Sequence, residues 1–479
     1  KDFDYLWPEM KNLKVDLVDE HFYRGFGNVL NGFVYFNGIQ VIFSWILMFA
    51  LYFVPYALMV GELGSAFKTS GGGVSSWIHE TISPKFAYYA GWTYWACHVT
   101  YIASKGSGGL KALSWMFFQN GTTYDQFPTI WIQLATLAAL LFFCWVASRG
   151  LNPLKKLATI AGTSMFVMSI LYILMMFAAP AINPNGGYVT MEFSKETLIP
   201  QFNLGYFTSL SILVFAVGGC EKISPYVNKV KDPSRGFPKG MIALAIMVMV
   251  CAILGTIAMG MMFDPAVINE SSESFNSYVS NGAYWSFQKL GEYYHVGNLL
   301  LIIYAACNAI GQFSTLVLSI DAPLRMLLDN EDARQFVPTK LLKKNQHGAY
   351  INGIFMVAGL SGSIILIQSF VPGAAAVLTQ LNKLNSVTMP LRYLWVFVAY
   401  IALRKAADKF HPEYRFVKNQ GIALTAGIWC FVVTAFCCIF GMYVEGDPAS
   451  TALNVITPFV LTALGLILPI IKKNEKAAG

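Results

Sequence analysis

Charged residues are scarce in this sequence. Only 12% of its 479 residues are Asp, Glu, Lys or Arg, whereas a soluble domain carries about 25%. Hydrophobic residues make up 56% of the chain, and the mean hydropathy is +0.52. This composition excludes an ordinary soluble domain and predicts an integral membrane protein with many spans.

Motifs for catalysis and metal binding are also missing. The six histidines are scattered, no CxxC pair occurs, and the eight cysteines all fall within apolar runs. These patterns predict neither a metal site nor a disulfide framework. No Walker motif is present, so we do not expect ATP-driven transport unless a partner supplies the ATPase. We therefore expect no enzyme activity and no cofactor, and we expect no nucleic-acid partner.

What the sequence does have is a series of long apolar runs, most of them long enough to cross a bilayer. They predict an all-α integral membrane protein of about 12 transmembrane helices. Span 1 is short and apolar only from residue 22 to residue 37. The other eleven are expected at 38–67, 85–118, 127–148, 154–182, 205–227, 240–263, 296–328, 349–370, 374–403, 421–444 and 451–471.

The basic residues of the loops predict the topology. Twenty-two Lys and Arg residues lie in one set of alternate loops and the C-terminal tail, and only Lys195 and Lys289 lie in the opposite set. Positively charged loops stay on the cytoplasmic side. We therefore expect a multi-pass protein of the plasma membrane with both termini in the cytoplasm.

Span 6 is interrupted in its middle. It contains the pair Gly218 and Gly219, followed at once by Glu221, a carboxylate that is costly in lipid unless it faces protein, water or a solute. A second glycine-rich stretch, GFGNV, stands in span 1 at residues 25–29. The two stretches stand five spans apart, in spans 1 and 6. Because five is an odd number, the second stretch enters the membrane from the opposite side, as in inverted repeats.

Two longer motifs resemble a known family. Span 2 ends in ALMVGELGSAFKTSGGGVSSWI, and the broken run FAVGGCE is followed by NKVKDPSRGFPKG. These resemble the hallmarks of the amino acid–polyamine–organocation (APC) permeases. The run GFGNVLNGFVYFNGIQVIFSW resembles their glutamate/γ-aminobutyrate antiporter-like branch.

The resemblance implies a LeuT-like fold of two five-helix inverted repeats, with helices 1 and 6 broken, plus two C-terminal helices. The predicted division is a polar segment at 1–24, repeats at 25–182 and 205–403, helices 11 and 12 within 421–471, and a tail at 472–479. Relatives begin helix 1 with an apolar half-helix, but VDLVDEHFYR stands there in this chain. We therefore expect the inner half of helix 1 to be atypical or truncated. Its carboxylates, those of Asp16, Asp19 and Glu20, should lie at the cytoplasmic face or line a water-filled vestibule.

The resemblance also implies a secondary active amino acid transporter that works by alternating access, either as an exchanger or coupled to protons. A transport-impaired relative and an ion channel are the alternatives. The cargo's carboxylate suits free N–H groups at the first break, and its ammonium suits carbonyls released at the second. The expected backbone ligands are Gly25, Gly27, Asn28 and Val29, then Phe215, Ala216 and Val217, with Gly218 and Gly219 allowing close approach.

Side chains buried in the spans complete the candidate site. Lys105, Lys383 and Glu221 must face the interior, where they bind cargo or one another. Asn308 lines the path or joins helices. Two lysines favour a glutamate-like or zwitterionic cargo, whereas a structural Lys–Glu pair is the alternative reading. The sequence does not indicate the oligomeric state.

Overall fold

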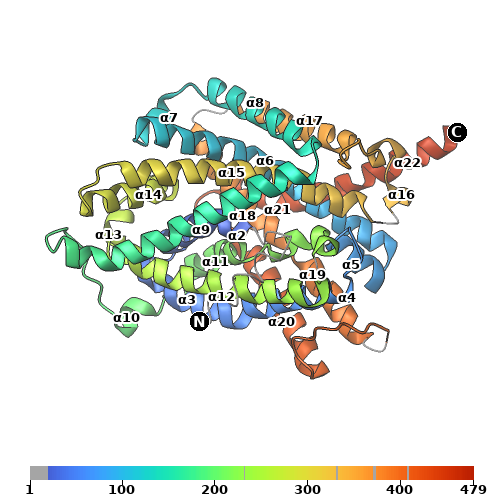
Figure 1. Cartoon of the computed structure of the whole chain (residues 1–479), viewed down its shortest axis with the longest axis horizontal. Coiled ribbons are helices and arrows are strands. Elements are labelled where there is room, and N and C mark those ends of the chain that lie inside the picture. The colour runs from blue at the N-terminus through green and yellow to red at the C-terminus, as the bar shows by residue number, and fades with distance from the viewer. Residues whose placement is uncertain (1–19, 231, 331–332, 371–373, 407–408, 479) are drawn as a thin grey trace.

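The chain folds into a bundle of helices that lie roughly side by side (Figure 1). The computed structural model describes residues 20–230, 232–330, 333–370, 374–406 and 409–478. No β-strand occurs among these residues, and the predicted all-α architecture is confirmed.

The first five predicted spans correspond to long helices. Span 1 is α2 (Glu20–Tyr35), and spans 3 to 5 are α6 (Pro84–Phe118), α8 (Thr129–Ser148) and α9 (Leu151–Ile182). Span 2 is a continuous helical run of four parts: η1 (Gly38–Gln40), α3 (Val41–Met48), the π-helical turn η2 (Phe49–Phe53) and α4 (Val54–Ala66). The loops contain α5 (Val74–Thr81), α7 (Thr122–Gln126) and, after span 5, α10 (Lys195–Leu198).

The remaining spans follow the predicted order. Span 6 consists of α11 (Leu204–Val217) and the 3₁₀ segment η3 (Cys220–Lys229), and spans 7 to 9 are α12 (Pro233–Gly260), α15 (Leu299–Leu328) and α17 (Ile351–Gln368). Span 10 is divided into α18 (Ala374–Leu391) and α19 (Leu394–Lys405). Spans 11 and 12 are α20 (Gln420–Gly441) and the run of α21 (Pro448–Ala463), η5 (Leu464–Leu466) and α22 (Ile467–Ala478). The loops hold α13 (Pro265–Ile268), α14 (Ser272–Tyr293), α16 (Ala333–Phe336) and η4 (Thr339–Leu342).

Ten of these spans are long and apolar enough, within the described residues, to cross a membrane. The two predicted spans outside this group are α2, of which 16 residues are described, and α6, which has 35 residues but carries three lysines and three serines. The center of the bundle is formed where α6 packs against α15.

The predicted outer and inner loops lie at opposite ends of the bundle. In Figure 1, α10, α13 and α14 gather at the left end, whereas α5, α16 and α22 lie at the right end. This separation is what a chain that crosses the membrane with alternating direction requires. Helix α14 lies where no helix is predicted, because it is too polar to read as a span. Its start is capped by Ser271, whose hydroxyl accepts a hydrogen bond of 3.0 Å from the Ser274 N–H.

The predicted break in span 6 is confirmed. Gly218 has an extended backbone, and Gly219 has φ = 112°, a value that glycine adopts at little cost. A Cβ atom on Gly218 would collide with the ring of Tyr393 and lie 2.8 Å from the Val214 carbonyl oxygen. Tyr393 stands between α18 and α19, so the interruptions of spans 6 and 10 pack directly against each other.

The predicted break in span 1 is wrong for residues 25–29. Helix α2 continues from Glu20 to Tyr35 without interruption, so the N–H groups of Gly25, Gly27, Asn28 and Val29 belong to its internal hydrogen-bond ladder. Glycine within a helix weakens it but does not break it when neighbouring helices pack around it. The carboxylates expected at Asp16 and Asp19 fall outside the described residues. The division into inverted repeats stays a prediction.

Buried carboxylates hold the spans together through arginines. Oε1 of Glu221 lies 3.6 Å from Nε of Arg392, both side chains are fully buried, and the Tyr56 hydroxyl donates to Oε2 of Glu221. Nη2 of Arg404 donates to Glu62 at 2.6 Å, and Nε of Arg325 donates to Asp321 at 2.7 Å. The first two pairs join span 10 to spans 6 and 2.

We predict that Glu221→Gln lowers stability, because it leaves the guanidinium of Arg392 buried without its carboxylate. Breaking one partner of a buried pair costs about 3–5 kcal/mol. The measurement is thermal unfolding in detergent, with Glu445→Gln at an exposed position as the matched control.

The double variant Glu221→Gln/Arg392→Gln should recover part of this loss, because it removes both charges. If Glu221→Gln unfolds at the wild-type temperature and yet transports poorly, the carboxylate acts in transport, as the sequence suggests, and the structural role is refuted.

Candidate functional site

A cavity of about 390 Å³ lies between the central helices. This volume is within the range of about 300–1,000 Å³ typical of small-molecule sites. Residues of α2, α6, α11, α15 and α18 form its walls, and α14 and the loop between α20 and α21 contribute to its lining. Because α14 and that loop belong to the predicted outer side, the cavity lies toward that end of the bundle.

Six of the predicted site residues line this cavity: Gly27, Asn28, Lys105, Phe215, Asn308 and Lys383. They come from five spans that are distant in sequence. These six residues therefore surround one space, and their role in binding cargo stays a prediction.

Three lysines give the cavity its electrostatic character. They are Lys105 and Lys111 on α6, which are 5% and 2% exposed, and Lys383 on α18. Lys105 donates to the amide oxygen of Gln312 at 3.3 Å, and Lys111 donates to the hydroxyl of Ser280 on α14. No carboxylate of the described residues forms an ion pair with any of the three.

The amide groups along α15 orient Lys105. Asn308 donates to the Tyr284 hydroxyl at 3.0 Å, and Gln312 donates to the Asn308 oxygen at 3.2 Å. This chain leaves the oxygen of Gln312 directed at the ammonium of Lys105. The ammonium also lies 4.9 Å from the centroid of the Tyr101 ring, close enough for a cation–π interaction. A fixed ammonium group in a polar cavity is suited to a carboxylate ligand.

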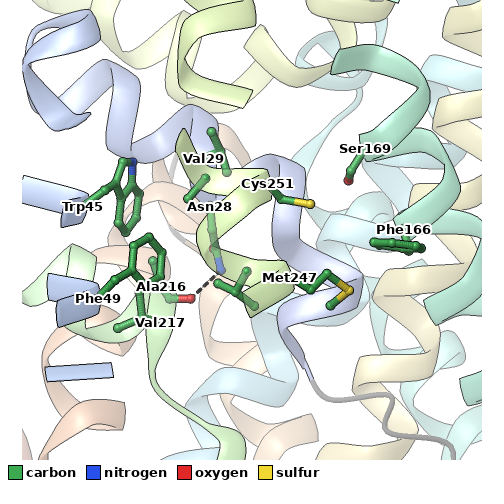
Figure 2. A pocket seen from close by; sticks show the side chains of 12 residues that line it. Asn28, Val29, Trp45, Phe49, Phe166, Ser169, Ala216, Val217, Met247 and Cys251 are labelled. Carbon is green, nitrogen blue, oxygen red and sulfur yellow. Dashed lines mark hydrogen bonds between the residues drawn. The ribbon is translucent and has the colours of Figure 1, made fainter. Parts of the chain in front are cut away.

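The backbone carbonyl of Ala216 accepts a hydrogen bond from another helix. The side-chain amide of Asn28 donates to it at 3.2 Å and joins α2 to α11 beside the break (Figure 2). The contact borders a separate, mainly apolar pocket of about 40 Å³, which Val29, Ala216 and Val217 also line. The Ala216 carbonyl oxygen has two lone pairs, so its expected role as an ammonium ligand stays a prediction beside this helix-to-helix contact.

The remaining predicted site residues lie outside the lining of the large cavity. Gly218, Gly219 and Glu221 form the break and its buried ion pair. Gly25 lies in the uninterrupted helix α2. Arg392 packs beside His98, with Nη1 3.0 Å from the imidazole nitrogens, so this polar cluster ties α6 to span 10.

Sequence reasoning missed several cavity residues. Lys111 could have been found by the rule that selected Lys105, because it is a second lysine inside the same span. Ser280 and Tyr284 gave no signal, since they lie in α14, where no helix is predicted.

Comparisons with known proteins agree with this arrangement. The family described as "Amino acid permease" matches residues 25–467. The chain is 46% identical over 462 residues to a protein named aspartate/glutamate permease AcaP of Lactococcus lactis subsp. cremoris, covering 94% of this chain and 93% of that protein.

Two more distant relatives are also transporters by name. Identity is 24% over 456 residues to the glutamate/gamma-aminobutyrate antiporter of Lactococcus lactis subsp. lactis, with 90% and 84% of the two chains covered. It is 23% over 480 residues to the inner membrane transporter YjeM of Escherichia coli, with 93% and 92% covered. The helical bundle, the broken span 6 and a family match along nearly the whole chain agree: this multi-pass membrane protein is an amino acid transporter, not an enzyme, and it belongs to the amino acid permease family of the APC superfamily.

Proposed function

We propose that this permease carries acidic amino acids, with the cargo's carboxylates bound by Lys105, Lys111 and Lys383. The observation that supports this most is the distribution of charge. Among the residues that the structure describes, the three buried carboxylates Glu62, Glu221 and Asp321 each have an arginine partner, whereas the cavity lysines donate to neutral groups or have no ion pair with a carboxylate.

An acidic amino acid complements such a cavity. It brings two carboxylates and one ammonium, and the lysines supply positive charge that forms no ion pair with a described carboxylate. Asp125 and Asp447 interact electrostatically with Lys111 and Lys383, but not as ion pairs. The one acidic residue of the lining is Glu445, an exposed side chain in the loop between α20 and α21. Hydroxyl and amide oxygens, such as those of Tyr284 and Asn308, offer acceptors for the cargo's ammonium. The name of the 46%-identical relative, an aspartate/glutamate permease, supports the same cargo class.

The transport mechanism that fits the family is secondary active transport by alternating access. We place both termini on the cytoplasmic side of the plasma membrane, because the basic loops gather at one end of the bundle and the positive-inside rule assigns that end to the cytoplasm. The cavity in this structure then belongs to the outer side. Coupling is either exchange against an internal amino acid or symport with protons.

We predict that purified protein in liposomes takes up labelled glutamate and that excess aspartate or glutamate blocks this uptake. Arginine and lysine should block poorly, since a buried positive charge repels a cationic side chain. Preloading the liposomes with glutamate and, separately, imposing a pH gradient distinguishes exchange from proton coupling. Equal block by arginine would overturn the proposed cargo. No uptake under either condition would indicate a transport-impaired relative. Uptake that does not saturate with substrate and is not blocked by an inhibitor would favour a channel.

We predict that Lys105→Gln raises the KM for glutamate about tenfold or more. A hydrogen bond to a charged group contributes about 1.5–3 kcal/mol, and each 1.4 kcal/mol corresponds to a factor of ten in affinity. Lys195→Gln, in an exposed loop away from the cavity, is the matched control and should leave KM unchanged. A wild-type KM in Lys105→Gln would show that the cargo does not bind at this lysine.

A further inference from the structure

A fourth buried lysine lies near the cavity but does not line it. Lys222 stands in η3, three residues after Gly219, and is only 4% exposed. Its ammonium donates to the hydroxyl of Ser319 on α15 at 2.9 Å. Burying a charged group costs free energy, and the positive end of a helical segment makes a cation there less favourable still.

Lys222 and the cavity lysine Lys105 share one aromatic ring. Their ammonium groups lie 5.4 and 4.9 Å from the centroid of Tyr101, whose side chain is fully buried on α6. Lys105 lines the cavity and Lys222 does not. The Tyr101 ring therefore connects two ammonium groups, one in contact with the cavity and one beyond it.

A polar stripe on α15 runs between the same two lysines. At 3.6 residues per turn, Asn308, Gln312, Thr315 and Ser319 fall within an arc of about 60°. The first two line the cavity, and Gln312 accepts from Lys105. The last two are buried beyond it, and Ser319 accepts from Lys222, about 10 Å further along the helix than Gln312 by the 1.5 Å rise per residue.

Thr315 lies between these two contacts. Its side chain is 1% exposed, and its hydroxyl oxygen has no hydrogen-bond partner among the described residues. A buried polar group without a partner is costly. A hydroxyl on this stripe would gain a partner if a polar ligand moved between the two lysines.

We propose that Lys222, Ser319 and Thr315 form a second carboxylate-binding station, which the cargo occupies when the transporter opens toward the side opposite α14. The inference rests on the proposed acidic cargo. A carboxylate that leaves Lys105 along the α15 stripe meets Thr315 and then Lys222. The ammonium of Lys222 and the two hydroxyl groups are donors, as an anion requires.

The test is a comparison of KM from the two sides. Glutamate transport is measured in right-side-out and inside-out membrane vesicles, and labelling of a cysteine at the exposed position Glu273 of α14 with an impermeant thiol reagent identifies the α14 side. Lys222→Gln should raise the KM about tenfold or more from the side opposite α14 and change it less than twofold from the α14 side. Lys222→Arg should restore most of the loss.

Two further variants keep the test decisive. Lys229→Gln, an exposed lysine in the same segment, is the matched control and should change neither KM. Thr315→Val keeps the ammonium of Lys222 and the shape of the Thr315 side chain, so it is the alternative test if Lys222→Gln does not fold. It should raise the KM from the side opposite α14 by a smaller factor. Equal KM changes from both sides, or none in either variant, would overturn the second station.

The two proposals fail separately. If wild-type protein does not transport glutamate or aspartate, the cargo assignment fails and the station fails with it. If wild-type protein transports glutamate, Lys105→Gln raises the KM from the α14 side, and Lys222→Gln and Thr315→Val behave as wild type from both sides, only the second station is refuted.

Discussion

The constraint on which this structure depends is that a charge buried among membrane helices must find a partner. Water is absent from the hydrocarbon region, so an uncompensated charge is strongly unfavourable. The three buried carboxylates meet this constraint with arginines: Glu62 with Arg404, Glu221 with Arg392, and Asp321 with Arg325. The two buried lysines of α6, Lys105 and Lys111, satisfy this constraint differently. Their ammonium groups contact neutral oxygens and aromatic rings at the border of a cavity. The protein thereby retains positive charge where an anionic cargo can enter.

The same contacts determine which helices are mechanically linked. The break in span 6 is joined to α2 by the bond from Asn28 to Ala216 and to span 10 by the ion pair of Glu221 with Arg392. The ring of Tyr393 fills the space that a side chain at Gly218 would need. The break in span 6 is therefore in direct contact with both span 1 and span 10. Helices that line the cavity and share such contacts are the parts through which binding of cargo could be coupled to opening and closing.

Helix α15 carries polar groups that contact the lysines of both proposed carboxylate sites. Its packing along α6 brings Gln312 to Lys105, and one helical face places Ser319 at Lys222. Since these groups follow one stripe, their alignment arises from helical periodicity once the two helices are packed. The lysines on α6 and η3 supply cations, and the hydroxyl groups on α15 can also donate hydrogen bonds, which suits carboxylates better than cationic amino acids.

The sequence by itself determined the features that depend on local composition. Long apolar runs predict the spans, basic loops predict their alternation, and Gly218–Gly219 predicts the break, because each signal lies within one continuous stretch. The rule that intramembrane charge is costly also found Lys105 and Lys383. Only the tertiary structure decided what each charge does. Glu221 and Lys105 look equivalent in sequence, yet packing places Arg392 beside the first and a cavity beside the second. Likewise, Gly25 and Gly27 resemble a helix break, but α2 passes through them uninterrupted. Partners of this kind come from helices far apart in the chain, and no local pattern encodes which of them will meet.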